Sequence, residues 1–589
     1  MLGKRAPQRG MFEADHLYLD FVGRDSFYGF LATERGNLFR DEDFGRLYCP
    51  DNGRNSVPPS LLATALLLQA HDRVSDGEAK RRADLDLSWK VALGIEIDQR
   101  PFAKSTLQMF RAQLILHDRV RAIFQRSLEY AQETGYLRGR KMKAVLDTSY
   151  ILGRGAVQDT YNLLAEGIKK LIWALARRLE RVKPQRWAEA HGLGRYFGSS
   201  LKGQAAIDWD DEASRQALLR GIVADAEGLL AIAGESLNHL PAGSQAEEQV
   251  REAAQLLVQL LGQDLERHDQ GQPRLKRGVA EDRIVSVHDP EMRHGHKSAS
   301  KRFEGHKLAL AVEPESQLVT AVEVLPGNAP DRERALALVE QSERNTGIQV
   351  EETIGDCAYG DGATREQFEQ AGRKLVAKVA RHGNRDRFPK EAFTIDLEAM
   401  SCTCPAGQVT RTLVSAATWR DRDGRTCVQQ AFRFDGATCA SCALRPACVR
   451  AGAGKGRSVN LHPQERLLQQ ARALQSSPAF EAYRAQRQVA EHRLARMMQL
   501  GMRRARYFGR TKTLFQALLA ATVANLTLIA GKMGRMGRQR SQEDLLGLLL
   551  SRFKVAVKWL WAHGSSIIPS WSSSSFPWQP PRPCFRPRL

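Results

Sequence analysis

Hydrophobic positions recur with helical spacing in the N-terminal part of the chain. Between residues 56 and 116, segments such as SLLATALLLQ show this spacing and predict several short helices. Ser75, with Glu78 three residues later, forms a capping-box pattern, and Ser105 or Thr106 is a second candidate helix start. Basic residues beside the helix starts fit a helix-turn-helix-like DNA-binding domain, but a plain helical bundle gives the same pattern.

The pattern changes to strands and helices in alternation further along the chain. KAVLDTSYIL, residues 143–152, reads as a strand, and residues 161–265 form a long helical tract. Two apolar runs, residues 306–313 and 317–325, are separated by PES and predict a hairpin. A helix, a strand, a helix and a strand follow up to about residue 379. This order predicts an α/β sheet with mixed strand directions that is covered by helices.

Composition divides the rest of the chain. Residues 388–456 are rich in Cys, Gly, Arg and Thr, helices resume at about residue 463, and the Ser/Pro/Trp-biased end reads as disordered. The resulting segments are an N-terminal helical DNA-binding domain (1–140), a first core strand (141–156), a helical insertion (157–280), a catalytic core (281–387), a Cys-rich insertion (388–460), C-terminal core helices (461–535) and a tail (536–589).

The chain shows no segment that clearly targets it to a membrane or for secretion. Its N-terminus lacks an apolar h-region. The apolar stretch 514–531 contains Gln516 and Asn525, which are costly in hydrocarbon, and therefore predicts a buried core helix. We expect an intracellular protein, in which the nine cysteines do not form a disulfide framework.

The charge balance is the strongest global signal. The 589 residues carry a net charge of +20. A protein this basic usually binds a polyanion, most often nucleic acid, and the alternative is a generic basic surface.

Three acidic residues occupy positions suited to metal binding. Asp147 lies inside an apolar strand, where an unpaired buried charge is costly. Asp356 ends the strand EETIGD before a Gly-containing turn, and is therefore either a cap of that turn or a ligand. Glu491 is the only acid in residues 491–512, with Arg487 one helical turn before it; an exposed ion pair is the alternative. Because clustered carboxylates repel, a Mg²⁺ ion would relieve the conflict.

Several segments, in order, resemble the bacterial insertion-sequence DDE transposases, specifically the eleven-eighty-two group. They are VLDTSY, RIVSVHDPEMRHGHKSASKRFEGHK, VLPGNAPD, TIGDCAYGDG and YRAQRQVAEHRLARMMQLGMRRARYFGRTKTLFQALLAATVANL, and together with the N-terminal helical region they cover residues 11–534. The resemblance implies a ribonuclease-H-like α/β catalytic core. It also implies that Asp147, Asp356 and Glu491 form the catalytic Asp-Asp-Glu triad.

The family's last signature contains a Tyr, an Arg, the catalytic Glu and a Lys at fixed spacing. Arg487 matches, with three residues between it and Glu491. Tyr483 stands one residue earlier than the signature asks, and Met498 stands at the position of the Lys. These departures concern the part of the signature that contacts phosphate, where nearby arginines are the candidate replacements.

The resemblance implies a specific reaction. Two Mg²⁺ ions, with Mn²⁺ as a substitute, would be held by Asp147, Asp356 and Glu491, with Asp147 as the bridging ligand. Water frees a 3′-hydroxyl at the transposon end, and that hydroxyl then attacks target DNA. The implied partners are the terminal inverted repeats and target DNA, bound by a homodimer in the bacterial cytoplasm at the nucleoid. A DNA-binding protein with an inactive core, or a metal-dependent nuclease without strand transfer, are the alternatives.

Two basic segments, RHGHKSASKRFEGHK and RRARYFGRTK, are the candidate DNA-binding regions. Tyr507 and Phe508 either stack on an exposed base or belong to the core. The histidines of the first segment and its surroundings, His288, His294, His296 and His306, lack a HExxH pattern and read as a solvated or phosphate-contacting loop. The candidate DNA-binding residues are Arg487, Arg503, Arg504, Arg506, Tyr507, Lys297, Lys301, Arg302 and Lys307.

The cysteines of the segment 388–460 are spaced like zinc ligands. Two pairs, Cys402 with Cys404 and Cys439 with Cys442, predict a possible structural zinc site, and plain reduced thiols are the alternative. A closed site of four thiolates would hold the insertion together and take no part in catalysis.

Overall fold

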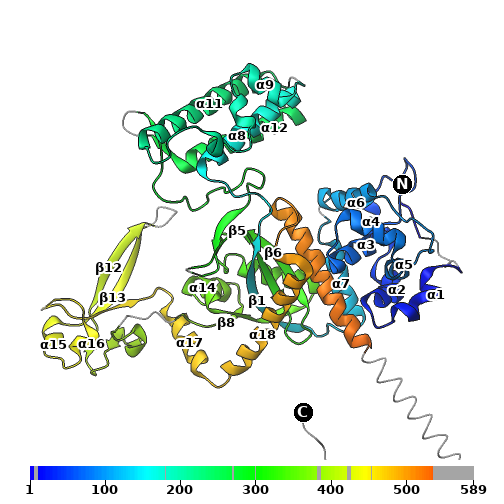
Figure 1. Cartoon of the computed structure of the whole chain (residues 1–589). Coiled ribbons are helices and arrows are strands. Elements are labelled where there is room, and N and C mark those ends of the chain that lie inside the picture. Colours follow the sequence, from blue (N-terminus) through cyan, green and yellow to red (C-terminus); the bar gives the residue numbers. More distant parts are fainter. Residues whose placement is uncertain are drawn as a thin grey trace, which may run out of the picture. The chain divides into compact units, whose positions relative to one another are not determined.

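The structure is a computed structural model that describes residues 1–534 apart from 6–10, 118, 180, 268–270, 299, 381–385, 421–425 and 453. The predicted tail lies outside these residues. Within them, Met1–Ile529 form one compact unit, whose elements are shown in Figure 1.

A six-stranded mixed sheet forms the centre of the core (Figure 1). Its strands are β1 (Lys141–Leu152), β4 (Arg293–His296), β5 (Arg302–Val312), β6 (Val319–Pro326), β7 (Gln349–Gly355) and β8 (Lys374–Ala377). The order is β4-β5-β1-β7-β8, and β6 also pairs with β5. β5 is antiparallel to both β1 and β6, whereas β1, β7 and β8 are mutually parallel. The predicted hairpin and the mixed strand directions are thereby confirmed.

Helices from distant parts of the chain cover this sheet. α13 (Ala335–Thr346), α14 (Gly362–Gln370) and α18 (Phe480–Met497) contact its strands, and α17 (Glu465–Ser476) packs on α14 and α18. α13 contacts β5, β6 and β7, and α18 contacts β1, β5 and β7. α13 ends where Gly347 adopts a φ of 64°, a left-handed conformation that glycine adopts without strain. A mixed α/β fold is therefore present, as predicted.

The N-terminal region is helical, as its periodicity predicts. Its elements are α1 (Ala14–Val22), α2 (Phe27–Leu38), η1 (Asp41–Leu47), α3 (Pro59–Asp72), α4 (Asp76–Leu85), α5 (Leu87–Leu93), α6 (Lys104–Leu116) and α7 (Ala122–Glu133). Ser75 caps α4, since its hydroxyl accepts a hydrogen bond from the Glu78 backbone N–H at 3.1 Å. The second cap prediction is wrong: the N-cap of α6 is Ala103, and Ser105 and Thr106 lie inside the helix. The helix begins at Lys104, two residues after buried Phe102, and its N-cap Ala103 has an extended backbone.

Two insertions interrupt the core. The helical one contains α8 (Thr160–Ala174), η2 (Leu175–Leu179), α9 (Pro184–Ala190), η3 (Gly194–Phe197), α10 (Leu201–Gln204), α11 (Glu212–Asn238), α12 (Gln245–Asp264) and the hairpin of β2 (Leu265–Arg267) and β3 (Pro273–Leu275). The Cys-rich one contains η5 (Lys390–Ala392), β9 (Thr394–Asp396), β10 (Ser401–Thr403), β11 (Val409–Thr410), β12 (Leu413–Arg420), β13 (Thr426–Arg433), α15 (Gly436–Ala440), α16 (Arg445–Cys448) and β14 (Ser458–Leu461). Each insertion has its own hydrophobic cluster of buried residues.

The apolar helix Arg510–Gly534 is long and apolar enough to cross a membrane by length and composition alone. However, 67% of its most apolar window is buried within the protein. Asn525 is fully buried there, accepting a hydrogen bond from the Val319 N–H at 2.9 Å and donating one to the Val319 carbonyl at 2.8 Å. These contacts are those of a core helix, as predicted from Gln516 and Asn525.

We expect Asn525→Leu to lower the free energy of unfolding by about 2–3 kcal/mol, because both polar backbone groups of Val319 lose their buried partner. Urea unfolding measures this change. Thr527→Val is the control: the Thr527 hydroxyl binds only the Val523 carbonyl of its own helix, and its loss should cost less than about 1 kcal/mol. Equal effects of the two substitutions would contradict the role assigned to Asn525.

Candidate functional site

The register between β1 and β7 places Asp147 and Asp356 side by side. Val145 is opposite Ile354 in this parallel pair. Asp147 and Asp356 each lie two residues further along, and therefore on the same face of the sheet. Asp356 follows the end of β7, and its Oδ1 accepts a hydrogen bond from the Ala358 N–H at 2.8 Å. It thus caps the short helix η4 (Cys357–Tyr359) while also lying beside Asp147.

Asp147 is the electrostatic centre of the site. Burial raises the pKa of its carboxyl to about 7; the N–H of Thr148 opposes this, Asp356 adds to it, Arg487 opposes it and Glu491 adds to it. The Thr148 N–H donates to Asp147 Oδ1 at 2.8 Å. Residues from β1, the end of β7 and α18 are therefore close enough to share one electrostatic environment.

Glu491 reaches this environment from α18 in the company of Arg487. The two side chains form an ion pair of 2.7 Å between Arg487 Nη2 and Glu491 Oε1, and both are partly exposed. Glu491 therefore forms the i, i+4 ion pair with Arg487 and also lies close enough to Asp147 to affect its pKa. In the part of the chain that the structure describes, no three His, Cys, Asp or Glu side chains stand ready as a metal-binding group.

Tyr359 is a residue of this site that the sequence analysis did not single out. It is buried, and its hydroxyl has no hydrogen-bond partner within the described structure. Burial raises its pKa, and the carboxylates of Asp147, Asp331 and Asp356 act in the same direction. A Cβ at Gly355 would lie 2.8 Å from the Tyr359 ring, so the glycine before Asp356 makes room for the ring. The motif CAYG, which follows Asp356, is the sequence feature that could have indicated Tyr359.

Three of the predicted DNA-binding cations gather around one aromatic ring. Arg503 Cζ lies 4.7 Å from the centroid of the Tyr150 ring, Lys297 Nζ 5.5 Å and Lys301 Nζ 5.8 Å. Tyr150 lies on β1, three residues after Asp147. This cluster, Tyr150 with its three cations, is called the Tyr150 platform. It brings together both basic segments of the sequence.

The other predicted cations have different surroundings. Arg302 is exposed. Lys307 is engaged inside the protein, where its Nζ lies 2.8 Å from Asp331 Oδ1 and donates to the Ala329 carbonyl. Arg504 lines a basic cavity of ≈ 290 Å³ together with Arg73 and Arg154.

Arg506 and Tyr507 lie against the N-terminal helices. Arg506 donates to Asp76 Oδ1 at 3.1 Å and to the Val74 carbonyl at 2.8 Å. Tyr507 lies under the guanidinium groups of Arg111 and Arg506, at 5.5 and 5.8 Å from its ring centroid. The contacts of Arg506 therefore join the segment after α18 to α4.

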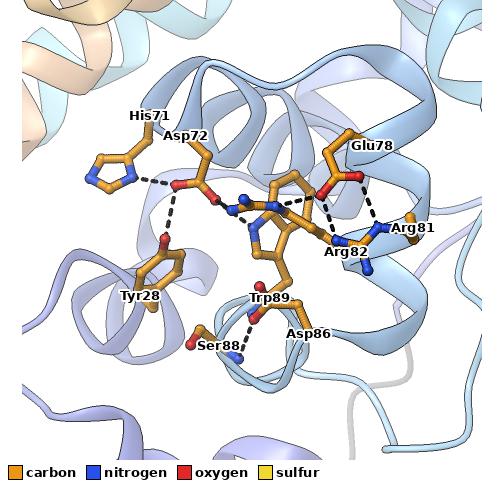
Figure 2. Close-up of polar contacts among 9 residues, drawn as sticks. All are labelled: Tyr28, His71, Asp72, Glu78, Arg81, Arg82, Asp86, Ser88 and Trp89. Atoms are coloured by element: carbon orange, nitrogen blue, oxygen red, sulfur yellow. Dashed lines mark hydrogen bonds and ion pairs between the residues drawn. The ribbon is translucent and has the colours of Figure 1, made fainter.

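Figure 2 shows a buried polar cluster around Asp72 in the N-terminal helices. Tyr28 and His71 contact Asp72 Oδ1 at 2.8 and 2.7 Å, while Trp89 and Arg82 donate to Oδ2 at 2.8 and 2.6 Å. Burial acts to raise the pKa of Asp72, but the hydrogen bonds from His71, Trp89 and Tyr28 outweigh it and lower the pKa to about 2. Asp72 thus fixes α2, α3, α4 and α5 relative to one another.

The structure places the four cysteines proposed as a zinc site in the Cys-rich insertion. Cys402 is fully buried in the hydrophobic cluster of this insertion, which also contains Cys448, and Cys404 and Cys439 pack against it. A cavity that includes residues of this cluster is lined by Cys404, Cys439, Cys442 and Cys448. The predicted zinc ligands, Cys402, Cys404, Cys439 and Cys442, stay a prediction.

One histidine of the predicted loop is also placed differently. His306 is fully buried in β5, with its Nε2 3.5 Å from Asp289 Oδ2. The reading of this residue as part of a solvated loop is wrong, because the strand pairing with β1 and β6 encloses it. His288 and His296 are exposed, in agreement with the prediction.

Two family models match parts of the chain. A family model described as "Transposase DDE domain" matches residues 403–530, which contain the Cys-rich cavity, α18 and Glu491. A second, described as "Transposase domain (DUF772)", matches residues 21–113, which contain the Asp72 cluster. A search of curated proteins found no match. Transposase models thus match both the N-terminal helices and the C-terminal segment of the chain, which supports an insertion-sequence DDE transposase.

Proposed function

We propose that this protein cleaves the ends of its own insertion sequence and joins them to target DNA. Asp147, Asp356 and Glu491 act as the catalytic triad. One observation carries the proposal. Three acids that lie far apart in the sequence come close enough for Asp356 and Glu491 to raise the pKa of Asp147, beside the parallel pair of β1 and β7. The strand order β6-β5-β1-β7-β8, with its antiparallel and parallel halves, supports a ribonuclease-H-like core.

The site fits Mg²⁺ by its chemistry. Its donors are carboxylate oxygens, which Mg²⁺ prefers, and Asp147 is buried next to further negative charge. Asp147, Asp356 and Glu491 would together hold the ions. When bound, such ions act as Lewis acids on the attacking and leaving oxygens of a phosphodiester.

Arg487 controls the availability of Glu491. In the free protein its guanidinium forms an ion pair with Glu491 Oε1. A DNA phosphate offers the guanidinium an alternative bidentate partner. We propose that Arg487 turns to DNA on binding and releases Glu491 to the site. The triad is thus completed when DNA is present.

The Tyr150 platform binds DNA. Its cations neutralise phosphates, and the tyrosine ring offers a stacking surface for an exposed base. Tyr150 lies three residues after Asp147 on β1, so its side chain leaves the strand on the opposite face. The chain's DNA partners would be its terminal inverted repeats and the target, held by a homodimer because transposition joins two ends. Such a protein works in the bacterial cytoplasm at the nucleoid.

Replacing both Lys297 and Lys301 with Ala should reduce the salt dependence of DNA binding. Each phosphate contact contributes about 0.9 to the slope of log affinity against log salt, so the slope should fall by about 2. Fluorescence anisotropy at several salt concentrations measures it. Lys183→Ala, at an exposed lysine of the helical insertion, should leave the slope unchanged. An unchanged slope in the double variant would remove the platform from the DNA interface.

The reaction itself is tested with wild-type protein, Mg²⁺ or Mn²⁺, labelled DNA carrying both flanks of the gene, and a plasmid target. Cleaved ends and covalent joints to the plasmid are expected. Cleaved ends without joints would instead make the protein a nuclease. Binding without cleavage in either metal would make it a DNA-binding protein with an inactive core.

A further inference from the structure

Four cysteines from different parts of the Cys-rich insertion line one small cavity. Cys404 stands in the turn between β10 and β11, Cys439 in α15, Cys442 directly after it, and Cys448 at the end of α16. The cavity has a volume of ≈ 30 Å³, the scale of a single ion or water molecule. These cysteines are free thiols, and the pair Cys439-x₂-Cys442 has the close spacing of structural zinc ligands, with Cys448 following six residues later.

Two arginines, Arg445 and Arg457, also line the cavity, and hydrogen bonds to backbone carbonyls hold both in place. Arg457 donates to the carbonyls of Cys448 at 3.1 Å and Phe388 at 3.2 Å, and Arg445 donates to the Gly452 carbonyl at 3.0 Å. A divalent ion with four thiolates carries a net charge of −2, which two guanidinium groups offset. Their hydrogen bonds also hold the backbone on either side of α16.

The insertion has little else to hold these elements together. The buried core of this segment is small: Phe393, Ile395, Cys402, Phe432, Phe434, Cys448 and Val459. Segments with so small a core are commonly stapled by a metal or by disulfides. In the part of the chain that the structure describes, the thiols do not yet form a ready metal group, so rotation of their side chains into the cavity must accompany binding.

We propose that Cys404, Cys439, Cys442 and Cys448 together bind one structural zinc ion, and that Cys402 is not a ligand. Zinc accepts four thiolates in a closed tetrahedral site. The ion would tie the β10–β11 turn to α15 and α16. Such a site has no open position, so it serves folding of the insertion and takes no part in the chemistry of the triad. The proposal is independent of the proposed function.

The full chain, expressed with zinc and gel-filtered, is tested by elemental analysis. About one zinc per chain is expected for the wild type. Cys448→Ser and Cys439→Ser should lose at least ~90% of it, whereas Cys402→Ala and Cys357→Ser should retain it. Zinc retained in Cys448→Ser, or lost in Cys402→Ala while that variant stays folded by circular dichroism, would overturn the ligand set. Wild-type protein without zinc would overturn the site.

Cobalt provides a second, spectroscopic readout of the same ligands. Co²⁺ added to chelator-treated wild type should give thiolate charge-transfer absorption and tetrahedral d–d bands. Zinc should displace the cobalt stoichiometrically. In Cys448→Ser the charge-transfer intensity should fall by about a quarter, with one thiolate of four removed. Equal spectra for the two proteins would exclude Cys448. Neither measurement involves DNA. A negative zinc or cobalt result would therefore not count against the triad, and a negative cleavage assay would not count against the zinc site.

Discussion

Asp147→Asn is expected to abolish metal-dependent cleavage of DNA that carries the ends of the element. The rate should fall on the order of 10³-fold or more, equivalent to ~4 kcal/mol of transition-state stabilisation. The substitution keeps the size of the side chain but removes the charge that would help to hold the Mg²⁺ ions. Asp356→Asn and Glu491→Gln should have comparable effects, because each removes one ligand of the same site. Gel analysis of end-labelled DNA with Mg²⁺ measures the rate.

The matched control is Glu351→Gln. Glu351 lies on β7 close to Asp356 in sequence, but its side chain is exposed and paired with Lys141. Its replacement should change cleavage by less than about 2-fold, since exposed ion pairs contribute little. Equal cleavage by the wild type and all three triad variants would exclude the triad.

Thermal unfolding separates loss of chemistry from loss of fold in the same proteins. In the presence of a chelator, Asp147→Asn should unfold at a temperature equal to or above that of the wild type. The amide removes a buried charge that lies beside two other carboxylates. Mg²⁺ should then stabilise the wild type and have little effect on the variant. A variant that is both inactive and markedly less stable would leave its inactivity explained by misfolding alone.

Asp72→Ala should cause the largest loss of stability among substitutions outside the candidate site. The free energy of unfolding of the N-terminal helices should fall by about 3 kcal/mol. The carboxylate is buried, and its removal leaves the Tyr28 hydroxyl and the Trp89 indole N–H without the acceptor seen in Figure 2. Urea unfolding followed by fluorescence and circular dichroism measures the change.

Glu78→Gln is the comparison within the same cluster. Its carboxylate binds Arg82, as Asp72 does, but it also binds Arg81 and lies nearer the surface. Its replacement should cost less than about 1 kcal/mol. A loss as large as that of Asp72→Ala would mean that the Arg82 ion pair, and not the buried hydrogen bonds of Asp72, stabilises the cluster.

The contribution of Asp72 should also depend on pH in a fixed direction. Its pKa is lowered from the ordinary value of 3.8 to about 2 in the folded protein. A lowered carboxyl pKa adds stability that is fully present above the ordinary value and is lost as the pH falls through the folded one. The difference between wild type and Asp72→Asn should therefore be constant near pH 6 and shrink between about pH 4 and pH 2. A constant difference in the free energy of unfolding over this range would contradict the lowered pKa of Asp72.

Local patterns were sufficient for the elements of the core. The apolar strand around Asp147, the PES hairpin and the helix before Gly347 appear where the sequence predicts them, as β1, β5 with β6, and α13. The reason is that side-chain period and turn residues act over a few neighbours, which are adjacent in the sequence itself. The cap of α4 at Ser75 follows the same rule. The false start predicted at Ser105 shows its limit, because the helix begins instead at Lys104, after the extended backbone of Ala103.

Positions of side chains from distant segments were decided by packing. Nothing near Cys402 in the sequence distinguishes it from Cys404, yet Cys402 is fully buried in the hydrophobic cluster, whereas Cys404 packs against that cluster and lines the cavity with Cys448. Similarly, Lys307 and Arg506 are candidate DNA-binding residues by sequence, but they have carboxylate partners in Asp331 and Asp76, 24 and 430 residues away in the sequence.

The amino-acid sequence alone determined the helices and strands, the basic character of the chain, the candidate acids and the resemblance to DDE transposases. Only the tertiary structure decided which of its acids, cations and cysteines become neighbours. The register of β1 on β7 sets Asp147 beside Asp356, and the packing of α18 on that sheet brings Glu491 to them. Such contacts arise from long-range packing and strand pairing, which no local period encodes.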